Sequence, residues 1–538
     1  MIEQLYSHLI ILPILVPMLS GALLILFSQR NFSLKFGISV LSTALQFAIA
    51  ACLLLLIERG HWQNGVGVYL AANWIAPFGI ALVVDRLAVL MLLLTPVLGL
   101  GAIWYSWVRW GRVGVHYFSL FQFLLMGLNG AFLTGDLFNL FVFFEVMLAA
   151  SYGLVLHGYN SARVRAGMQY IVVNLLCSSL FLIGVALIYA ATGTLNMADI
   201  AARTPALATP DRHLLHVGTT ILVVAFLTKS ALWPLCFWLP TTYSTASPPV
   251  AAMLVLLTKV GIYTILRLWS LVFSVDAGSS AGFGASVLLW SGIVTIGFGI
   301  VGLIASQDPG RIGSYSAIVS SGTLLSIISF GQTLTTSAAL FYMLSSTLAV
   351  AAFMLLVELI ERIRNPAAAM LALTMEAFAI GDEPGESAGV AIPGALAFVG
   401  LAFVFCAMIM AGMPPLSGFL AKFGIFHALM EGHEETSMGY AGWTLVTVIV
   451  VSGFAAIISF MRFGVRTFWA SPIAKAPRLQ VTEAAPIFAL VMICVFFTVQ
   501  AGPLKRYLDR AAASLHAPQG YIHQVLSHAA VPGPGGAP

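Results

Sequence analysis

Hydrophobic stretches of about twenty residues, long enough to cross the hydrocarbon layer as a helix, recur along this chain from beginning to end. Only 8% of the residues are charged, whereas a soluble domain carries about 25%. A backbone inside lipid must satisfy its own hydrogen bonds, and the stretches lack the alternating pattern of a membrane barrel. The sequence therefore predicts an all-α polytopic membrane protein of the bacterial inner membrane, in contact with the lipid bilayer.

Cofactor and nucleic-acid signals are missing from the sequence. The five cysteines lie far apart without a CxxC pair, which argues against a disulfide framework, an iron–sulfur cluster or a zinc site. We find no phosphate-binding loop, dinucleotide fingerprint or histidine pair at metal spacing. The formal charge of +4 is small and dispersed. We therefore expect no cofactor, no metal site and no nucleic acid among the partners.

Polar, glycine and proline residues divide the chain into about fourteen spans. The seventh and twelfth spans are interrupted by prolines, at Trp233–Pro240 and Gly412–Gly418. Proline removes a backbone donor and breaks a helix, and broken helices in membranes line cavities. More of the basic residues fall in odd-numbered loops than in even-numbered loops and the C-terminal tail. This bias predicts cytoplasmic odd loops and periplasmic termini.

Four charged residues remain inside the predicted spans. They are Glu145, Lys229, Lys259 and Lys422. Glu145 follows the start of the fifth span at Asp136 by about 13–14 Å of helix rise, which places it near mid-membrane. A charge at the bilayer centre costs at least about 2.5–3.5 kcal/mol. A single structural pair would leave two lysines unexplained. Because desolvation favours the neutral form of each group, we predict a proton relay.

Hydroxyl, carboxyl and imidazole groups near these four charges are candidates for the relay or for a hydrated path. They are Asp136, Thr228, Ser230, Thr258, Tyr315, Ser320, Ser321, Ser345, Ser346, Thr347, Ser417 and His427. Asn174 and Ser178 on the sixth span can also contribute. Small polar residues equally mediate ordinary helix packing in membranes, and this alternative stays open for each of them.

Three segments carry a family resemblance: Gly135–Glu145 (GDLFNLFVFFE), Phe226–Tyr263 and Gly412–Phe426 (GMPPLSGFLAKFGIF). They resemble the antiporter-like subunits. This family includes the large subunits of Mrp-type multisubunit Na⁺(K⁺)/H⁺ antiporters and the proton-pumping membrane subunits of respiratory complex I. Within the family the chain most resembles the D-type subunits of Mrp antiporters, because Lys422 stands where one complex I subunit carries an acid.

The resemblance implies fourteen helices with two inverted five-helix repeats and discontinuous helices 7 and 12. It divides the chain into helices 1–3 (1–110), a first repeat (111–272), a second repeat (280–468) with an acidic loop at 365–389, and helix 14 with a C-terminal tail (469–538). The tail from Ala517 onward is expected to be disordered.

The resemblance also implies a role for each buried charge. Glu145 corresponds to the key carboxylate of helix 5, Lys229 to the central lysine of helix 7, Lys259 to the bridging lysine of helix 8, and Lys422 to the terminal lysine of helix 12. It implies a secondary active transporter subunit, not an enzyme. Its partners would be A-, B-, C-, E-, F- and G-type subunits, with H⁺ and Na⁺ or K⁺ as transported ions.

Helix 11 departs from the family pattern. Many relatives carry a histidine and a lysine where this chain has Ser345 and Val350. We hypothesise that Ser345, Ser346 and Thr347, with bound water, bridge the two repeats instead. Two rival functions stay open. One is a proton-translocating subunit of a complex I-like or membrane hydrogenase assembly, and the other is a scaffold that seats active subunits.

Overall fold

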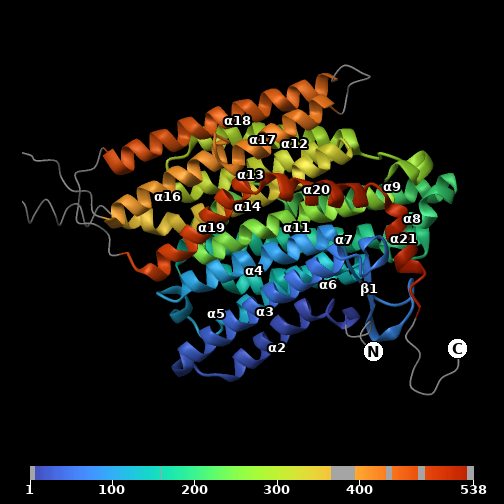
Figure 1. Ribbon diagram of the computed structural model, residues 1–538, viewed down its shortest axis with the longest axis horizontal. Coiled ribbons are helices and arrows are strands. Elements are labelled where there is room, and N and C mark those ends of the chain that lie inside the picture. Colours follow the sequence, from blue (N-terminus) through green and yellow to red (C-terminus); the bar gives the residue numbers. More distant parts are fainter. Residues whose placement is uncertain (1–5, 159, 365–393, 432–438, 470–478, 530–538) are drawn as a thin grey trace, which may run out of the picture.

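The computed structural model describes residues 6–158, 160–364, 394–431, 439–469 and 479–529. The predicted acidic loop at 365–389 lies outside these described residues. Long helices run side by side through an elongated bundle, and the few short elements gather mostly at its ends (Figure 1). The arrangement is that of a membrane protein whose helices cross the bilayer in parallel and antiparallel directions.

Most of the predicted spans are single continuous helices. Ten helices of the described chain are long and apolar enough to cross a membrane: α3 (Phe32–Glu58), α4 (Arg86–Ser106), α6 (Leu137–Val155), α7 (Ser161–Thr192), α11 (Pro248–Val272), α12 (Ala285–Ala305), α14 (Thr333–Arg364), α16 (Gly394–Ala411), α18 (Tyr440–Gly464) and α19 (Val481–Val499). Two shorter apolar helices accompany them, α2 (Leu12–Leu26) and α5 (Tyr117–Leu133). The more polar α9 (Thr209–Lys229) and α13 (Pro309–Ile328) pack along α7 and α12. The prediction of fourteen spans is confirmed.

Two of the spans are broken near the middle of the bundle. Helix α9 ends at Lys229, and α10 (Trp238–Thr245) continues the span after an irregular segment. Helix α16 ends at Ala411, and α17 (Ser417–Glu431) follows it. The two broken spans run in opposite directions (Figure 1), as inverted repeats require. The predicted discontinuous helices and fold class are confirmed, whereas the domain boundaries stay a prediction.

A two-stranded antiparallel hairpin, which the sequence did not predict, marks one end of the bundle. Strands β1 (Gly67–Leu70) and β2 (Ala81–Val84) pair with Gly67 opposite Val84. We call this end the hairpin end. The described N-terminal residues also lie there, because the Tyr6 ring contacts His61, 4.6 Å away. The first and last described residues thus lie on one side of the bundle (Figure 1).

The C-terminal segment folds back over the hairpin end. Helix α20 (Ala501–Leu515) packs on α14, and α21 (Pro518–Leu526) packs on the hairpin. The prediction of disorder from Ala517 onward is therefore wrong for the described part of the tail. The remaining short elements are α8 (Met197–Arg203), the 3₁₀ turns η1 (Gln29–Asn31), η2 (Gln63–Gly65), η3 (Ala71–Asn73), η4 (Trp110–Arg112), η5 (Thr204–Ala206) and η6 (Val275–Ser280), and the π-helical turn η7 (Val465–Trp469).

A buried ion pair holds the hairpin end together. Arg267 of α11 forms two hydrogen bonds with the Asp85 carboxylate, at 2.6 and 2.7 Å, and both side chains are below 10% exposed. Arg267 is thus a buried charge that the sequence analysis did not single out. Arg267 lies near the end of a hydrophobic run. Its position in the sequence does not show that the side chain turns inward and binds a carboxylate of a distant segment.

A second charged network lies at the opposite end of the bundle. Glu358 of α14 accepts hydrogen bonds from Tyr105, Trp110 and Arg362 at 3.2, 2.8 and 2.8 Å. Arg362 also binds the Glu483 carboxylate of α19 at 2.6 Å. These groups tie α4, α14 and α19 together. The four charges singled out from the sequence are therefore not the only buried ones.

We predict that Arg267→Gln strongly destabilises the protein. Breaking a buried pair leaves a buried, uncompensated carboxylate at Asp85, a change that costs about 3–5 kcal/mol. Thermal unfolding of the detergent-solubilised protein should show a clear loss of Tm. The control is Lys505→Gln, which removes an exposed pair with Asp509 and should cost at most about 1 kcal/mol. Equal melting of Arg267→Gln and the unmodified protein would refute the assigned role.

Candidate proton relay

The break in the seventh span sets the position of Lys229. Lys229 is the last residue of α9 and so lies at a helix C-terminus, where a cation is favoured. The side chain is 5% exposed, and its Nζ has no hydrogen-bond partner among the described residues. Nζ lies 5.1 Å from the centre of the Phe144 ring. The ammonium group is therefore buried with few compensating contacts, an arrangement that is costly for a charge.

Glu145 follows Phe144 on α6 and faces the neighbouring helix α7. Its carboxylate accepts a short hydrogen bond from the Ser178 hydroxyl. It interacts electrostatically with Lys229, although no ion pair within 4.0 Å joins the two among the described residues. Glu145 is only partly buried in this chain. The acid and the amine are therefore neighbours that a small movement or a water molecule can connect.

Lys259 lies in the centre of α11, a helix whose middle is completely enclosed by the bundle. Its side chain is 0% exposed. Nζ donates to Ser320 at 2.9 Å and to Ser321 at 3.4 Å, both on α13. Ser320 in turn donates to Ser346 of α14 at 2.9 Å. Two of the predicted path residues thus bind the lysine directly, and a third extends the chain of hydroxyls.

The adjacent serines of α14 contact two different helices. Ser346 accepts a hydrogen bond from Ser320 of α13, which also binds Lys259, while the Ser345 hydroxyl lies 2.8 Å from the Ser417 hydroxyl at the start of α17. Lys422, five residues farther along α17, donates to the carbonyl of Ala411 at 2.8 Å. That carbonyl is the end of α16, so the second helix break supplies the acceptor. The third predicted bridge residue, Thr347, instead donates to Met343 of its own helix.

A small cavity lies beside Lys229, between α6, α7, α10 and α11. Its volume of about 10 Å³ is close to what one water molecule needs. Asn174, Tyr170 and Tyr243 contribute polar groups to its lining. Tyr243 also donates to the Leu254 carbonyl and contacts the Thr258 hydroxyl, next to Lys259. Tyr243 therefore contacts the residue that precedes Lys259 and also lines the cavity beside Lys229.

Tyr243 was not among the residues predicted from the sequence. The polar run Thr241–Ser247, which follows a proline inside a hydrophobic span, is the sequence feature that points to this position. Thr228 and Ser230, which were predicted, have local roles here. Thr228 donates to the Val224 carbonyl of its own helix. Ser230 packs against Gly261 of α11, where an added Cβ would lie 2.1 Å from its Oγ.

Three further candidates lie away from the four charges. Asp136 caps the start of α6 by accepting from the backbone N–H of Asn139 at 2.9 Å. Tyr315 packs against Gly302 of α12. His427 lies on the outside of α17, more than half exposed, and pairs with Glu431. None of these three is hydrogen-bonded to a relay residue within the described chain. Those residues also contain no group of three or more histidine, cysteine or acidic side chains able to hold a metal.

Known proteins share this sequence and this architecture. The model of the family described as NADH:quinone oxidoreductase/Mrp antiporter, transmembrane, matches residues 134–447. The chain is 52% identical to the D subunit of a probable K⁺/H⁺ antiporter of Rhizobium meliloti, over 97% of this chain and 98% of that protein. It is 34% identical to the D subunit of a Na⁺/H⁺ antiporter of Alkalihalophilus pseudofirmus, over 97% and 99%. A chain in the structure of the Mrp complex from Dietzia sp. is 26% identical, with a TM-score of 0.81 and coverage of 97% and 99%.

Proposed function

This chain belongs to the NADH:quinone oxidoreductase/Mrp antiporter transmembrane family, and we propose that it is the D-type subunit of a multisubunit monovalent cation/proton antiporter. It is a membrane transport protein, and the proposal makes it part of a secondary active transporter. Protons move through Glu145, Lys229, Lys259 and Lys422. One observation carries the proposal: hydroxyl groups extend from Lys259 to α14 and from α14 to the start of α17.

The relay works because each buried charge alters the proton affinity of its neighbour. A nearby positive charge favours the ionised form of a carboxyl group, and loss of that charge favours its neutral form. One charge crossing 100 mV is worth about 2.3 kcal/mol. A change of one pKa unit corresponds to about 1.4 kcal/mol. A membrane potential can therefore drive stepwise transfer between groups whose proton affinities differ by one or two units.

Proton uptake is supported by a larger cavity at the end opposite the hairpin. It has a volume of about 360 Å³, and its lining includes Glu358, Asn160 and Tyr243. Tyr243 also lines the small cavity beside Lys229. Tyr243 thus belongs to the linings of both the larger cavity and the small cavity beside Lys229. Under the predicted topology this end faces the cytoplasm, and both termini face the periplasm of the inner membrane.

Partner subunits are supported by the outer face around Glu145. Apolar residues on α6 and α7 are exposed there, with Phe138 49% and Leu176 64% accessible. A partly exposed carboxylate at mid-membrane depth is costly against lipid. A neighbouring membrane protein that covers this face would shield Glu145 and could exchange protons with it. We propose A-, B-, C-, E-, F- and G-type subunits as the partners, with H⁺ and Na⁺ or K⁺ as the transported ions.

A complex I-like or membrane hydrogenase subunit would use the same buried charges. The high identity to the D subunit of an antiporter, 52% over nearly the whole chain, favours the antiporter. Absorbance of the purified complex separates the two functions. A redox-driven assembly contains iron–sulfur clusters that absorb visible light, whereas the proposed antiporter does not.

We predict that Glu145→Gln abolishes cation/proton antiport in vesicles that contain the assembled complex. Glutamine keeps the size of the side chain but cannot release a proton. Fluorescence quenching of a pH-sensitive dye measures the exchange. Glu431→Gln, which neutralises the exposed partner of His427, is the matched control and should retain activity. If Glu145→Gln antiports normally, Glu145 does not carry protons. Loss of assembly instead of transport would favour the scaffold.

We also predict that the double variant Ser345→Ala with Ser346→Ala slows antiport by about tenfold or more, because each lost hydrogen bond contributes about 1 kcal/mol. The measurement is the initial rate of proton movement in the same vesicles. Thr347→Val is the control, since Thr347 bonds only to its own helix among the described residues and should change the rate little. Equal rates in the double variant and the unmodified protein would remove the serine bridge from the mechanism.

A further inference from the structure

A basic cavity opens beside the start of α3, at the end of the bundle opposite the hairpin. Its volume is about 350 Å³, and it is lined by Phe32, Ser33, Lys35, Gly111, Arg112, Gly114, Val115 and Phe118. The lining comes from the first residues of α3, the turn η4 with the loop after it, and the start of α5. Here α3 begins and α4 has just ended, so the cavity lies at the membrane–water boundary.

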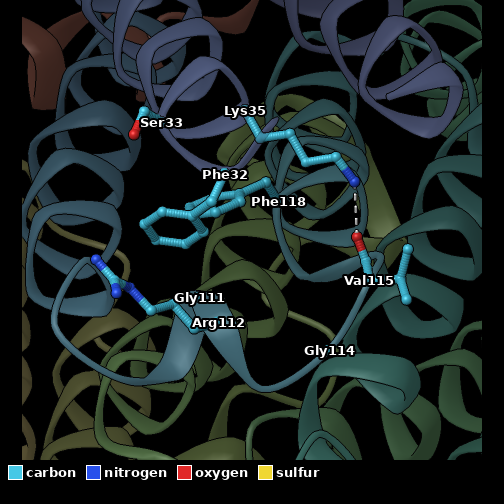
Figure 2. Close-up of a pocket in the computed structure, with 8 residues that line it drawn as sticks. All are labelled: Phe32, Ser33, Lys35, Gly111, Arg112, Gly114, Val115 and Phe118. Carbon is cyan, nitrogen blue, oxygen red and sulfur yellow. Dashed lines mark hydrogen bonds between the residues drawn. The ribbon is translucent and has the colours of Figure 1, made fainter. Parts of the chain in front are cut away.

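The two cations of this cavity have no acidic partner among the described residues. Lys35 donates to the backbone carbonyl of Val115 at 3.0 Å. The Arg112 guanidinium lies over two rings, 4.8 Å from the centre of Phe32 and 5.8 Å from that of Trp107. Its N–H donors have no hydrogen-bond acceptor in the described structure. Figure 2 shows the Arg112 and Lys35 side chains on opposite sides of the Phe32 ring.

The charge of the cavity contrasts with that of two other arginines at this end. Arg109 and Arg362 both bind the Glu358 carboxylate. No carboxylate lines the basic cavity within the described chain. At a membrane surface, where charge is poorly screened, two uncompensated cations attract an anionic group. Ser33, which also lines the cavity, adds a hydroxyl donor of the kind that phosphate oxygens accept.

The residues around the opening of the cavity indicate which kind of molecule the anionic group belongs to. Leu34, Val113 and Val115 are 48%, 49% and 46% exposed. Large apolar side chains exposed at the level where helices leave the membrane contact lipid chains, and aromatic residues such as Trp107 are typical of this level. A ligand that suits both the rim and the cations has a phosphate and an apolar tail.

We propose that this cavity binds the headgroup of an anionic phospholipid. The phosphate lies against the Arg112 guanidinium and Ser33. A second negative charge, or a polar group of the headgroup, reaches Lys35. The acyl chains extend past Val113 and Val115 into the bilayer. The bound lipid neutralises the charge that the protein leaves unpaired between α3, α4 and α5.

The test compares phospholipid retention by purified variants of the full chain. Each protein is equilibrated in detergent micelles containing phosphatidylglycerol and phosphatidylcholine, washed, and analysed by native mass spectrometry. We expect the unmodified protein to retain phosphatidylglycerol in preference to phosphatidylcholine. The double variant Lys35→Gln with Arg112→Gln should retain about thirtyfold less, since each of the two cations near a membrane surface contributes about 1 kcal/mol and every 1.4 kcal/mol is a factor of ten. Retention should also fall at high salt.

Two further variants keep the result interpretable. Arg311→Gln removes an exposed arginine at the start of α13, outside the cavity, and should retain phosphatidylglycerol fully. Arg112→Lys preserves the charge and should keep most of the retention even if the double variant folds poorly. Equal retention in all variants would overturn the proposal. So would displacement of the lipid by millimolar inorganic phosphate, because the site would then be one for a free anion.

Discussion

An amine buried in hydrocarbon must find a partner, and the protein meets this requirement differently for each of its three central lysines. Lys422 binds the last carbonyl of a broken helix, and Lys259 binds two serine hydroxyls. Lys229 contacts an aromatic ring and a small cavity instead of a hydrogen-bond acceptor. A strong, permanent carboxylate partner would hold each ammonium in one state. Weak neutral partners leave the proton free to move, so the way these lysines are buried is itself the basis of the proposed transport.

The helix breaks make such burial possible. At each break, a helix stops in the middle of the bundle and presents its last carbonyls at that depth, as Ala411 does for Lys422. The continuous helices α11 and α14 pass between the breaks and carry Lys259 and the paired serines. Charged networks around Arg267 and Glu358 lie at the two ends. The two ends of the bundle thus carry ion pairs, whereas the three central lysines have no carboxylate partner within 4.0 Å among the described residues; in our proposal this difference separates stability from proton transfer.

The partly covered position of Glu145 connects this chain to an assembly. Its carboxylate has a serine partner inside the chain, but its helix also presents apolar residues outward. The basic cavity near Arg112 is comparable, because the described chain places cationic side chains there without a carboxylate to pair with them. In both places the chain is incomplete by itself. A neighbouring membrane protein completes the first in our proposal, and an anionic lipid completes the second.

The sequence alone determined the membrane class, the number of spans, the two helix breaks and the identity of the four mid-membrane charges. These follow from composition, hydrophobic length and proline position, which are local properties of the chain. Only the tertiary structure decided that Arg267 is buried against Asp85, that a hairpin and α21 pack together at one end, and that Tyr243 lines both the larger cavity and the small cavity beside Lys229. It also decided that Ser345 and Ser346 contact different partners, whereas Thr347 bonds to its own helix. Such pairings join residues far apart in sequence, and helix periodicity places a side chain on a face without specifying which distant group meets it there.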